Sequence, residues 1–232
     1  MISVVHRIFP PGDPTDAEIG ALYGGVRPAV EGRPWVGLSM ITSLDGATAV
    51  DGLSGGLGNA NDRAVFGALR AAADVIVVGA RTATAEGYRP TARPGQRIAV
   101  VTSSGLVDTS GELFTSGCAF LVVPDDAGAI PTGVESIRAG QGSVDLAGAL
   151  RQFTTIVPST RFVLAEGGPR LNGALLDAGC LDELDLTIAP ALVGGDSSRI
   201  VAGATELRRS WRLVHVLTDE DGYLFTRWVR SG

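Results

Sequence analysis

The chain has 232 residues, of which 45% are hydrophobic and 19% charged, a composition typical of a globular protein with a substantial core. The net charge of −6 argues against a surface that follows nucleic-acid phosphates. No apolar run approaches the length of a membrane span or of a signal-peptide core. We therefore expect a cytoplasmic protein with no nucleic-acid or membrane partner.

The first 34 residues are rich in proline and glycine, and we expect them to form an arm packed on one domain that comprises residues 35–232. Cys118 and Cys180 lie far apart in apolar stretches, and we expect two buried thiols rather than a disulfide or a metal pair. Because histidine and cysteine do not cluster, no metal site is expected.

The first core strand is predicted over Trp35–Thr42, and the turn Ser43-Leu44-Asp45-Gly46 follows it. Asp45 has two interpretations. Its carboxylate could simply cap or turn the chain after the strand. It could instead lie beside a ligand cleft, where it would bind a polar heterocycle or supply a proton. The sequence alone favours neither.

Two further strands end in residues suited to binding a nucleotide. A helix is predicted over Asn61–Ala73, and the apolar strand Asp74–Val78 then leads into Gly79-Ala80-Arg81-Thr82. Another strand, Arg97–Thr102, ends in Thr102-Ser103-Ser104. The hydroxyls there could bind an adenosine ribose or its 2′-phosphate, or they could be ordinary turn formers.

The segment Phe162–Gly179 reads as a buried strand, a glycine turn and a helix. Pro169 stands at the first helical position and Gly179 just beyond the end, the usual punctuation of a helix. The amides of Gly167 and Gly168, next to that helix N-terminus, could bind a phosphate or a pyrophosphate. Paired glycines at such a junction are, however, more often only a tight turn.

Glu166 favours a ligand-binding site over a simple tight turn at this junction. A carboxylate at the carboxyl end of a buried strand lies where open α/β sheets bind their ligands. The junction at Gly167 also resembles the earlier one at Gly79. Two such junctions suggest the two ends of one ligand, as a dinucleotide would have.

The remaining predicted elements complete an α/β fold with a mainly parallel central sheet, helices on both faces and a C-terminal antiparallel hairpin. The hairpin is predicted from a strong turn signal at Asp221-Gly222. These elements are a strand at Phe120–Val123, a helix at Asp145–Phe153, a strand at Glu183–Ala189, and the hairpin strands Trp211–Val216 and Tyr223–Val229.

Missing motifs exclude several chemistries. The chain has no G-x-G-x-x-G, so a standard Rossmann site is not supported. It contains no lysine at all, which removes P-loop and Schiff-base mechanisms. A nucleophile elbow with a well-placed histidine is also lacking, so Ser/His/Asp catalysis is not supported.

Three stretches together carry a family resemblance: RPWVGLSMITSLDG, LRAAADVIVVGART and FVLAEGGPRLNGALLDAGCLDELDLTIAP. From about Arg33 to its C-terminus the chain resembles the reductase domain of riboflavin biosynthesis, which has the dihydrofolate-reductase-like fold. The resemblance implies an NADPH-dependent reductase, usually a homodimer, that acts on 5-amino-6-(5-phosphoribosylamino)uracil and reduces its ribosyl group to ribityl by direct hydride transfer. The zinc deaminase signature of bifunctional members is missing, so the chain resembles a stand-alone reductase.

The resemblance also implies the site residues, with Asp45 and Glu166 as the candidate catalytic residues. Arg70 and Arg93 would hold the substrate phosphate, and Glu166 would accept hydrogen bonds from the heterocycle. The implied substrate contacts are Ser54, Arg70, Pro90, Arg93 and Glu166. The implied NADP(H) contacts are Ile41, Gly56, Thr82, Glu86, Ser103 and the segment 168–174, and the junctions add Gly79, Thr102, Gly167, Gly168, Pro169, Arg170 and Leu171.

The chain departs from the family pattern mainly in the substrate half. Lysines common in the family are replaced by Ser39 and Ala47, and a usual Trp-Ile-Thr reads Gly56-Leu57-Gly58. A typical Asp-Asp-Pro reads Glu86-Gly87-Tyr88. One alternative keeps the cofactor and changes the substrate to dihydrofolate or another pteridine, with Asp45 binding the ring. Another is a non-catalytic module that binds NADP(H).

Overall fold

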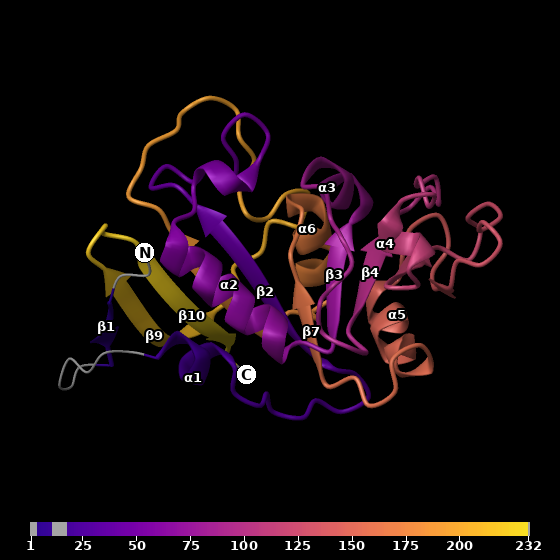
Figure 1. Cartoon of the computed structure of the whole chain (residues 1–232), viewed down its shortest axis with the longest axis horizontal. Coiled ribbons are helices and arrows are strands. Elements are labelled where there is room, and N and C mark those ends of the chain that lie inside the picture. The colour runs from indigo at the N-terminus through magenta and orange to yellow at the C-terminus, as the bar shows by residue number, and fades with distance from the viewer. Residues whose placement is uncertain (1–3, 11–17, 232) are drawn as a thin grey trace.

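The computed structural model describes residues 4–10 and 18–231, and its centre is one sheet with the strand order β1-β9-β10-β8-β2-β7-β3-β4-β5-β6 (Figure 1). From β8 to β6 neighbouring strands are parallel, whereas β1, β9 and β10 pair antiparallel at the other edge. In sheet order the strands are β1 (Val5–Phe9), β9 (Trp211–Asp219), β10 (Leu224–Arg230), β8 (Glu183–Ile188), β2 (Trp35–Thr42), β7 (Phe162–Ala165), β3 (Val75–Gly79), β4 (Arg97–Val101), β5 (Ala119–Val123) and β6 (Ser136–Arg138).

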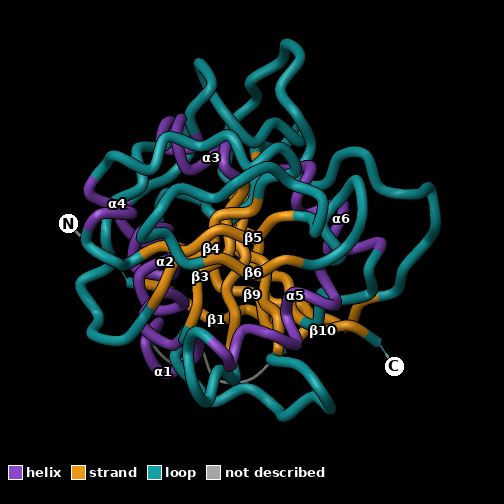
Figure 2. Tube along the Cα trace, turned by 90° about the vertical axis from the view of Figure 1, so that its right-hand side faces the viewer, coloured by secondary structure: helices purple, strands orange, loops and turns teal. Residues whose placement is uncertain are grey.

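Helices cover both faces of the sheet (Figure 2). Leu69 of α2 and Tyr23 of α1 pack with Leu164 on one face, and α3 and α4 continue that layer over β3 and β4. Leu150 of α5 and Leu175 of α6 pack on the opposite face. The helices are α1 (Ile19–Tyr23), α2 (Ala60–Ala72), α3 (Ala80–Ala85), α4 (Glu112–Thr115), α5 (Leu146–Gln152) and α6 (Pro169–Asp177), with single 3₁₀ turns η1 (Ser54–Gly56) and η2 (Phe153–Thr155).

The predicted α/β class with a mainly parallel sheet and a C-terminal antiparallel hairpin is confirmed. The strand over Trp35–Thr42 has the predicted bounds. The next predicted strand begins one residue later than expected, at Val75. Asp74 still hydrogen-bonds to both neighbouring strands through its backbone, and its carboxylate accepts from the amides of residues 161 and 162. The strands β1 and β6 were not predicted: β1 lies in the proline- and glycine-rich N-terminal stretch, and β6 has only three residues.

Part of the predicted N-terminal arm belongs to the sheet itself. Of residues 1–34 the structure describes 4–10 and 18–34. Val5–Phe9 pairs antiparallel with β9, and α1 lies against α2. The strand of this segment therefore extends the same ladder as the rest of the sheet.

A buried ionic cluster lies under α1, between the antiparallel strands and β2. The Glu183 carboxylate, which is fully buried, accepts hydrogen bonds from Arg27, Arg227 and the indole of Trp35. Arg27 also donates to the carbonyl oxygens of residues 23 and 25. These contacts tie the segment before β2 to the far half of the sheet.

Lowering the pH should destabilise the protein through His215, which lies edge-on to Tyr23 in this cluster. Burial and the nearby Arg227 lower the pKa of His215 to about 4. Between about pH 6.5 and about pH 4 the unfolded chain therefore binds a proton that the folded chain does not, so stability falls as the pH falls. The full effect is about 3 kcal/mol, at about 1.4 kcal/mol per unit of pKa. Above about pH 6.5 the His215 ring is neutral in both the folded and the unfolded chain, so this residue no longer makes the free energy of unfolding depend on pH.

Urea unfolding of the wild type and of His215→Phe, repeated across this pH range, checks that expectation. The difference in unfolding free energy between the two proteins should change with pH, because only the wild type carries the titrating ring. Two stability curves that stay parallel from neutral pH to about pH 4 would contradict it.

Both cysteines are free thiols. Cys180 is buried as expected, whereas Cys118 is only half-buried. Within residues 4–10 and 18–231, no helix is long and apolar enough to cross a bilayer. The same residues contain no group of three or more His, Cys, Asp or Glu side chains arranged to hold a metal ion.

Candidate functional site

A cleft of about 2230 Å³ opens at the carboxyl ends of the parallel strands. Its floor includes Ile41 at the end of β2, Gly79 after β3 and Glu166 after β7, and its walls come from α2, α3 and α6. This is the edge of an open α/β sheet at which ligands are expected to bind. The strands bring together residues that are more than 100 positions apart in the chain.

The two glycine junctions meet at the centre of this cleft. The Gly79 amide donates a hydrogen bond of 2.7 Å to the Gly167 carbonyl oxygen. Gly167 has a φ of 90°, a conformation that favours glycine. A Cβ atom on Gly168 would lie 2.5 Å from the Thr82 hydroxyl oxygen, so only glycine lets the two junctions approach this closely. The prediction that both junctions belong to one site agrees with this contact.

Most residues predicted to bind the cofactor line the cleft, but Gly56, Gly167, Asn172 and Gly173 do not. Gly56 packs against Val50, and Gly55 lines the cleft in its place. Gly167 is buried behind Gly168. The predicted cofactor residues on the cleft wall are Ile41, Gly79, Thr82, Glu86, Thr102, Ser103, Gly168, Pro169, Arg170, Leu171 and Ala174.

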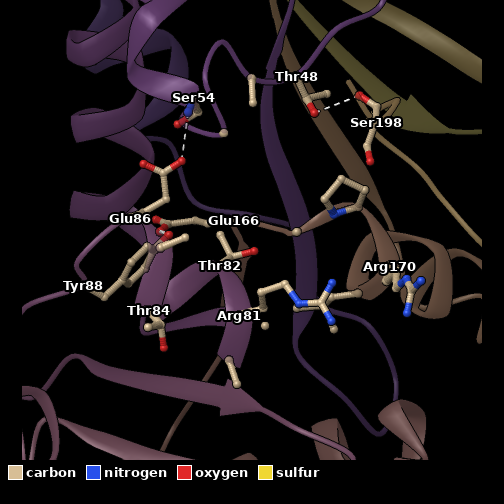
Figure 3. A pocket seen from close by; sticks show the side chains of 18 of the residues that line it. Thr48, Ser54, Arg81, Thr82, Thr84, Glu86, Tyr88, Glu166, Arg170 and Ser198 are labelled. Atoms are coloured by element: carbon tan, nitrogen blue, oxygen red, sulfur yellow. Dashed lines mark hydrogen bonds between the residues drawn. The ribbon is translucent and has the colours of Figure 1, made fainter. Parts of the chain in front are cut away.

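The cleft can accept an anionic ligand at the start of α6, a helix of nine residues whose first position is Pro169. The N-terminus of a helix offers free amide groups and the positive end of its dipole. Arg170 lies there, and Arg81 lies at the start of α3 (Figure 3). Both side chains are exposed, and neither has a hydrogen-bond or ion-pair partner among the residues that the structure describes. Two free guanidinium groups on one wall favour a phosphate-bearing ligand.

Glu166 forms the polar centre of the other half of the cleft. The residue is buried, and its carboxylate accepts two hydrogen bonds from the Arg70 guanidinium, at 2.7 and 2.6 Å. The hydroxyl of Tyr88 donates a third, at 2.6 Å. Ser54 and Pro90, two of the predicted substrate contacts, line the same part of the cleft. Arg70 and Glu166 are thus brought together as predicted, but they bind one another.

Two loop contacts bridge the walls of the cleft (Figure 3). The Ser54 amide donates to the Glu86 carboxylate at 2.9 Å, which joins η1 to the end of α3. The Thr48 hydroxyl donates to the Ser198 carbonyl oxygen at 2.9 Å. Both contacts hold the loop between β2 and α2 over the carboxyl ends of the strands.

Arg93 does not line the cleft. Its guanidinium donates to the carbonyl oxygens of Ala71 and Ala73 at the end of α2, and one nitrogen lies 3.7 Å from the Asp74 carboxylate. The last carbonyl groups of a helix have no intrahelical partner, and a cation is a favourable partner for them. In this structure Arg93 therefore caps a helix rather than facing the position predicted for the substrate phosphate.

Asp45 lies outside the cleft on an exposed turn. Its carboxylate accepts hydrogen bonds from the Ser43 hydroxyl and from the amides of Val193 and Gly194. These bonds, the one from Ser43 first, lower the pKa of Asp45 to about 2. The placement agrees with the first of the two interpretations, a carboxylate that ties the turn to a neighbouring loop.

Sequence reasoning missed Tyr88 and Arg81 as site residues. Tyr88 was noted only as a departure from the family pattern, and nothing local shows that its hydroxyl reaches a carboxylate 78 positions away. Arg81 lies inside a junction that had been singled out for its glycine and threonine. The positive charge of Arg81, between Gly79 and Thr82, is the sequence signal that could have indicated an anion-binding residue.

The model of the RibD C-terminal domain matches residues 34–225. The 2,5-diamino-6-ribosylamino-4(3H)-pyrimidinone 5′-phosphate reductase of Methanothermobacter thermautotrophicus is 27% identical over 197 residues, which cover 78% of this chain and 90% of the relative.

Two solved structures show the same fold. A pyrimidine reductase-like protein from Corynebacterium diphtheriae superposes with a TM-score of 0.78 at 23% identity, covering 93% of this chain and all of that protein. Dihydrofolate reductase from Enterococcus faecalis, solved with NADP(H), superposes with a TM-score of 0.52 at 14% identity, covering 88% of this chain and all of that protein. The predicted dihydrofolate-reductase-like fold is confirmed.

Proposed function

The chain belongs to the RibD C-terminal domain family, as its sequence resemblance predicted, and from this premise we propose that it is an NADPH-dependent cytoplasmic reductase. Its substrate would be 5-amino-6-(5-phosphoribosylamino)uracil or a closely related ribosylamino-pyrimidine. The reductase activity of the methanogen relative supports the reaction class.

One observation carries the proposal: the contact between the Gly79 and Gly168 junctions, next to the buried Glu166. The missing side chain of Gly168 leaves room at the start of α6, and the cofactor pyrophosphate would lie there against the helix amides. Arg81, Arg170 and the hydroxyls of Thr102 and Ser103 would face the adenosine end. The residues present therefore fit a phosphorylated dinucleotide.

When bound, NADPH would supply the hydride, and the chain's own residues would bind and orient the two reactants. Glu166 would accept a hydrogen bond from an N–H group of the heterocycle, because Oε1 retains a lone pair beyond the one used by Arg70. The walls of α2 and α3 would hold the ring beside the nicotinamide. The bridge between Ser54 and Glu86 would limit the access of water.

NADPH oxidation by the purified protein tests the proposal, with the ribosylamino-pyrimidine phosphate and dihydrofolate offered in parallel. Turnover of the pyrimidine is the expected result. NADPH binding without oxidation by either compound would favour a non-catalytic NADP(H)-binding module. Failure to bind NADPH would contradict the proposal altogether.

A second candidate, reduction of dihydrofolate or another pteridine, is favoured by one specific observation. Both arginines predicted to hold the substrate phosphate are engaged elsewhere, Arg70 with Glu166 and Arg93 with the end of α2. A pteridine without a phosphate would need neither. Its ring would then be bound by Glu166, because Asp45 lies outside the cleft.

A homodimer is proposed as the functional state. The side chains of Leu184, Leu186 and Ile188 on β8 are only half-buried and share one face of the sheet. Covering that face with a second copy would bury apolar surface. Sedimentation of the purified protein at micromolar concentration measures the oligomeric state, and a monomer would argue against it.

Replacing Arg81 with glutamine should weaken NADPH binding about tenfold and leave NADH binding unchanged. A charge-assisted hydrogen bond to the 2′-phosphate contributes about 1.5 kcal/mol, and about 1.4 kcal/mol is one factor of ten. Fluorescence titration with each cofactor measures both dissociation constants. Arg151→Gln, at the end of α5 and outside the cleft, is the matched control. An equal loss of affinity for NADPH and NADH would show that Arg81 does not bind the 2′-phosphate.

A further inference from the structure

The family pattern assigns Arg70 to the substrate phosphate, but in this structure the Arg70 guanidinium binds the carboxylate of Glu166. Its Nε and one terminal nitrogen form a two-pronged contact with the two oxygens of Glu166, at 2.7 and 2.6 Å. This fork is the geometry in which arginine binds one carboxylate most strongly. Its side chain is one-third exposed, whereas that of Glu166 is 2% exposed. Releasing the fork would leave a buried carboxylate without its cation.

Tyr88 completes the same arrangement. Its hydroxyl donates to Glu166 at 2.6 Å, and its ring lies beneath the Arg70 guanidinium, with 5.3 Å between the charge centre and the ring centroid. The ring of Phe66 also contacts this guanidinium, with 4.6 Å between the charge centre and the ring centroid. Figure 3 shows Tyr88 extending along the cleft wall to Glu166. Two cation–π contacts thus add to the Glu166 carboxylate in fixing the Arg70 guanidinium.

The phenol of Tyr88 remains a donor over the physiological range. Its burial and the neighbouring Glu166 charge raise the pKa of Tyr88 above its usual value. With three donated hydrogen bonds, two from Arg70 and one from Tyr88, the orientation of the carboxylate is determined before any ligand enters. Oε2 accepts two of these bonds and Oε1 accepts one, so the acceptor site left on Oε1 has a fixed direction, as recognition of a flat heterocycle requires.

We infer that Arg70 and Tyr88 are positioning residues that hold the Glu166 carboxylate for the heterocycle, and that Arg70 does not bind the substrate phosphate. This inference rests on the proposed function, since it assigns roles within the same cleft. It gives Tyr88, a departure from the family pattern, a specific task.

A pair of substrates separates the two roles of Arg70. The ribosylamino-pyrimidine phosphate and its dephosphorylated riboside are compared for the wild type, Arg70→Gln, Arg70→Lys and Tyr88→Phe. If Arg70 positions Glu166, Arg70→Gln should lower kcat/KM on the order of 100-fold for both compounds, and Tyr88→Phe about tenfold for both. Arg70→Lys should not restore activity, because lysine keeps the charge but not the fork. The dissociation constant for NADPH should stay unchanged, and Arg151→Gln again serves as the control.

A loss confined to the phosphorylated compound, with recovery in Arg70→Lys, would overturn the inference and make Arg70 a phosphate ligand. If the wild type reduces neither compound, the proposed function fails, and a titration without substrate tests the contact between Tyr88 and Glu166 on its own. The ionisation of Tyr88 is followed by its phenolate absorbance, as the difference between a protein and its Tyr88→Phe counterpart. Glu166→Gln should lower the pH at which Tyr88 ionises, since a carboxylate no longer opposes the phenolate. No shift would show that the two side chains are not coupled.

Discussion

Replacing Gly168 with valine should abolish NADPH binding and leave the protein folded. The first atom of any side chain at this position lies 2.5 Å from the Thr82 hydroxyl oxygen, and the further methyl groups fill the space at the start of α6. We expect the dissociation constant to rise at least about 100-fold, which corresponds to about 2.8 kcal/mol. Fluorescence titration with NADPH measures the affinity, and urea unfolding verifies the fold.

Two further variants make the Gly168 result specific. Gly128→Val places the same side chain on an exposed loop outside the cleft, where a Cβ would meet nothing within 4 Å, and should bind NADPH as the wild type does. Thr82→Ala in combination with Gly168→Val removes the close contact but not the added bulk, so this double variant should still fail to bind. Wild-type affinity in Gly168→Val would place the pyrophosphate elsewhere.

Replacing Arg27 with leucine should destabilise the fold by about 3 to 5 kcal/mol, the usual cost of breaking a buried ion pair by removing one partner. Arg27 donates twice to Glu183, at 3.2 and 2.8 Å, and twice to backbone carbonyl oxygens. The side chains of both charged residues are at most 1% exposed, so water cannot replace the lost donors. Urea unfolding at neutral pH measures the change.

Arg89→Leu is the matched control for the Arg27 variant. The Arg89 guanidinium lies 3.7 Å from Glu112, but these two side chains are 82% and 70% exposed. Exposed pairs of this kind contribute at most about 1 kcal/mol. Similar losses in the two variants would show that burial of the Arg27 pair does not determine its contribution to stability.

The parts of the fold that could be predicted are those whose signals are local. Pro169 and Gly179 mark the ends of α6 in the sequence itself, and the apolar run before Gly79 can only be a buried strand. The glycine junctions were found in the same way, since close backbone approach requires glycine whatever the neighbour is. Their contact with one another follows from the position of β3 next to β7.

The roles of individual charged residues could not be read in this way. Arg93 and Arg70 are both arginines near the predicted cleft, yet one caps α2 and the other holds Glu166. Which partner a long side chain reaches depends on distances between elements, which the sequence does not contain. Asp45 could be left only as two alternatives for the same reason, because Val193 and Gly194 are nearly 150 positions away.

The position of β2 between β7 and β8 also has a consequence for biosynthesis. Leu38 pairs with residues 165 and 184, so both neighbours of this apolar strand leave the ribosome more than 100 residues after it. Until then its two hydrogen-bonding edges have no native partner, and unpaired apolar edges are prone to join other chains. Closing such long-range pairs is also slow. During translation β2 is therefore exposed to aggregation until β7 and β8 have been synthesised. We expect β2 to be the segment of the nascent chain that a chaperone shields.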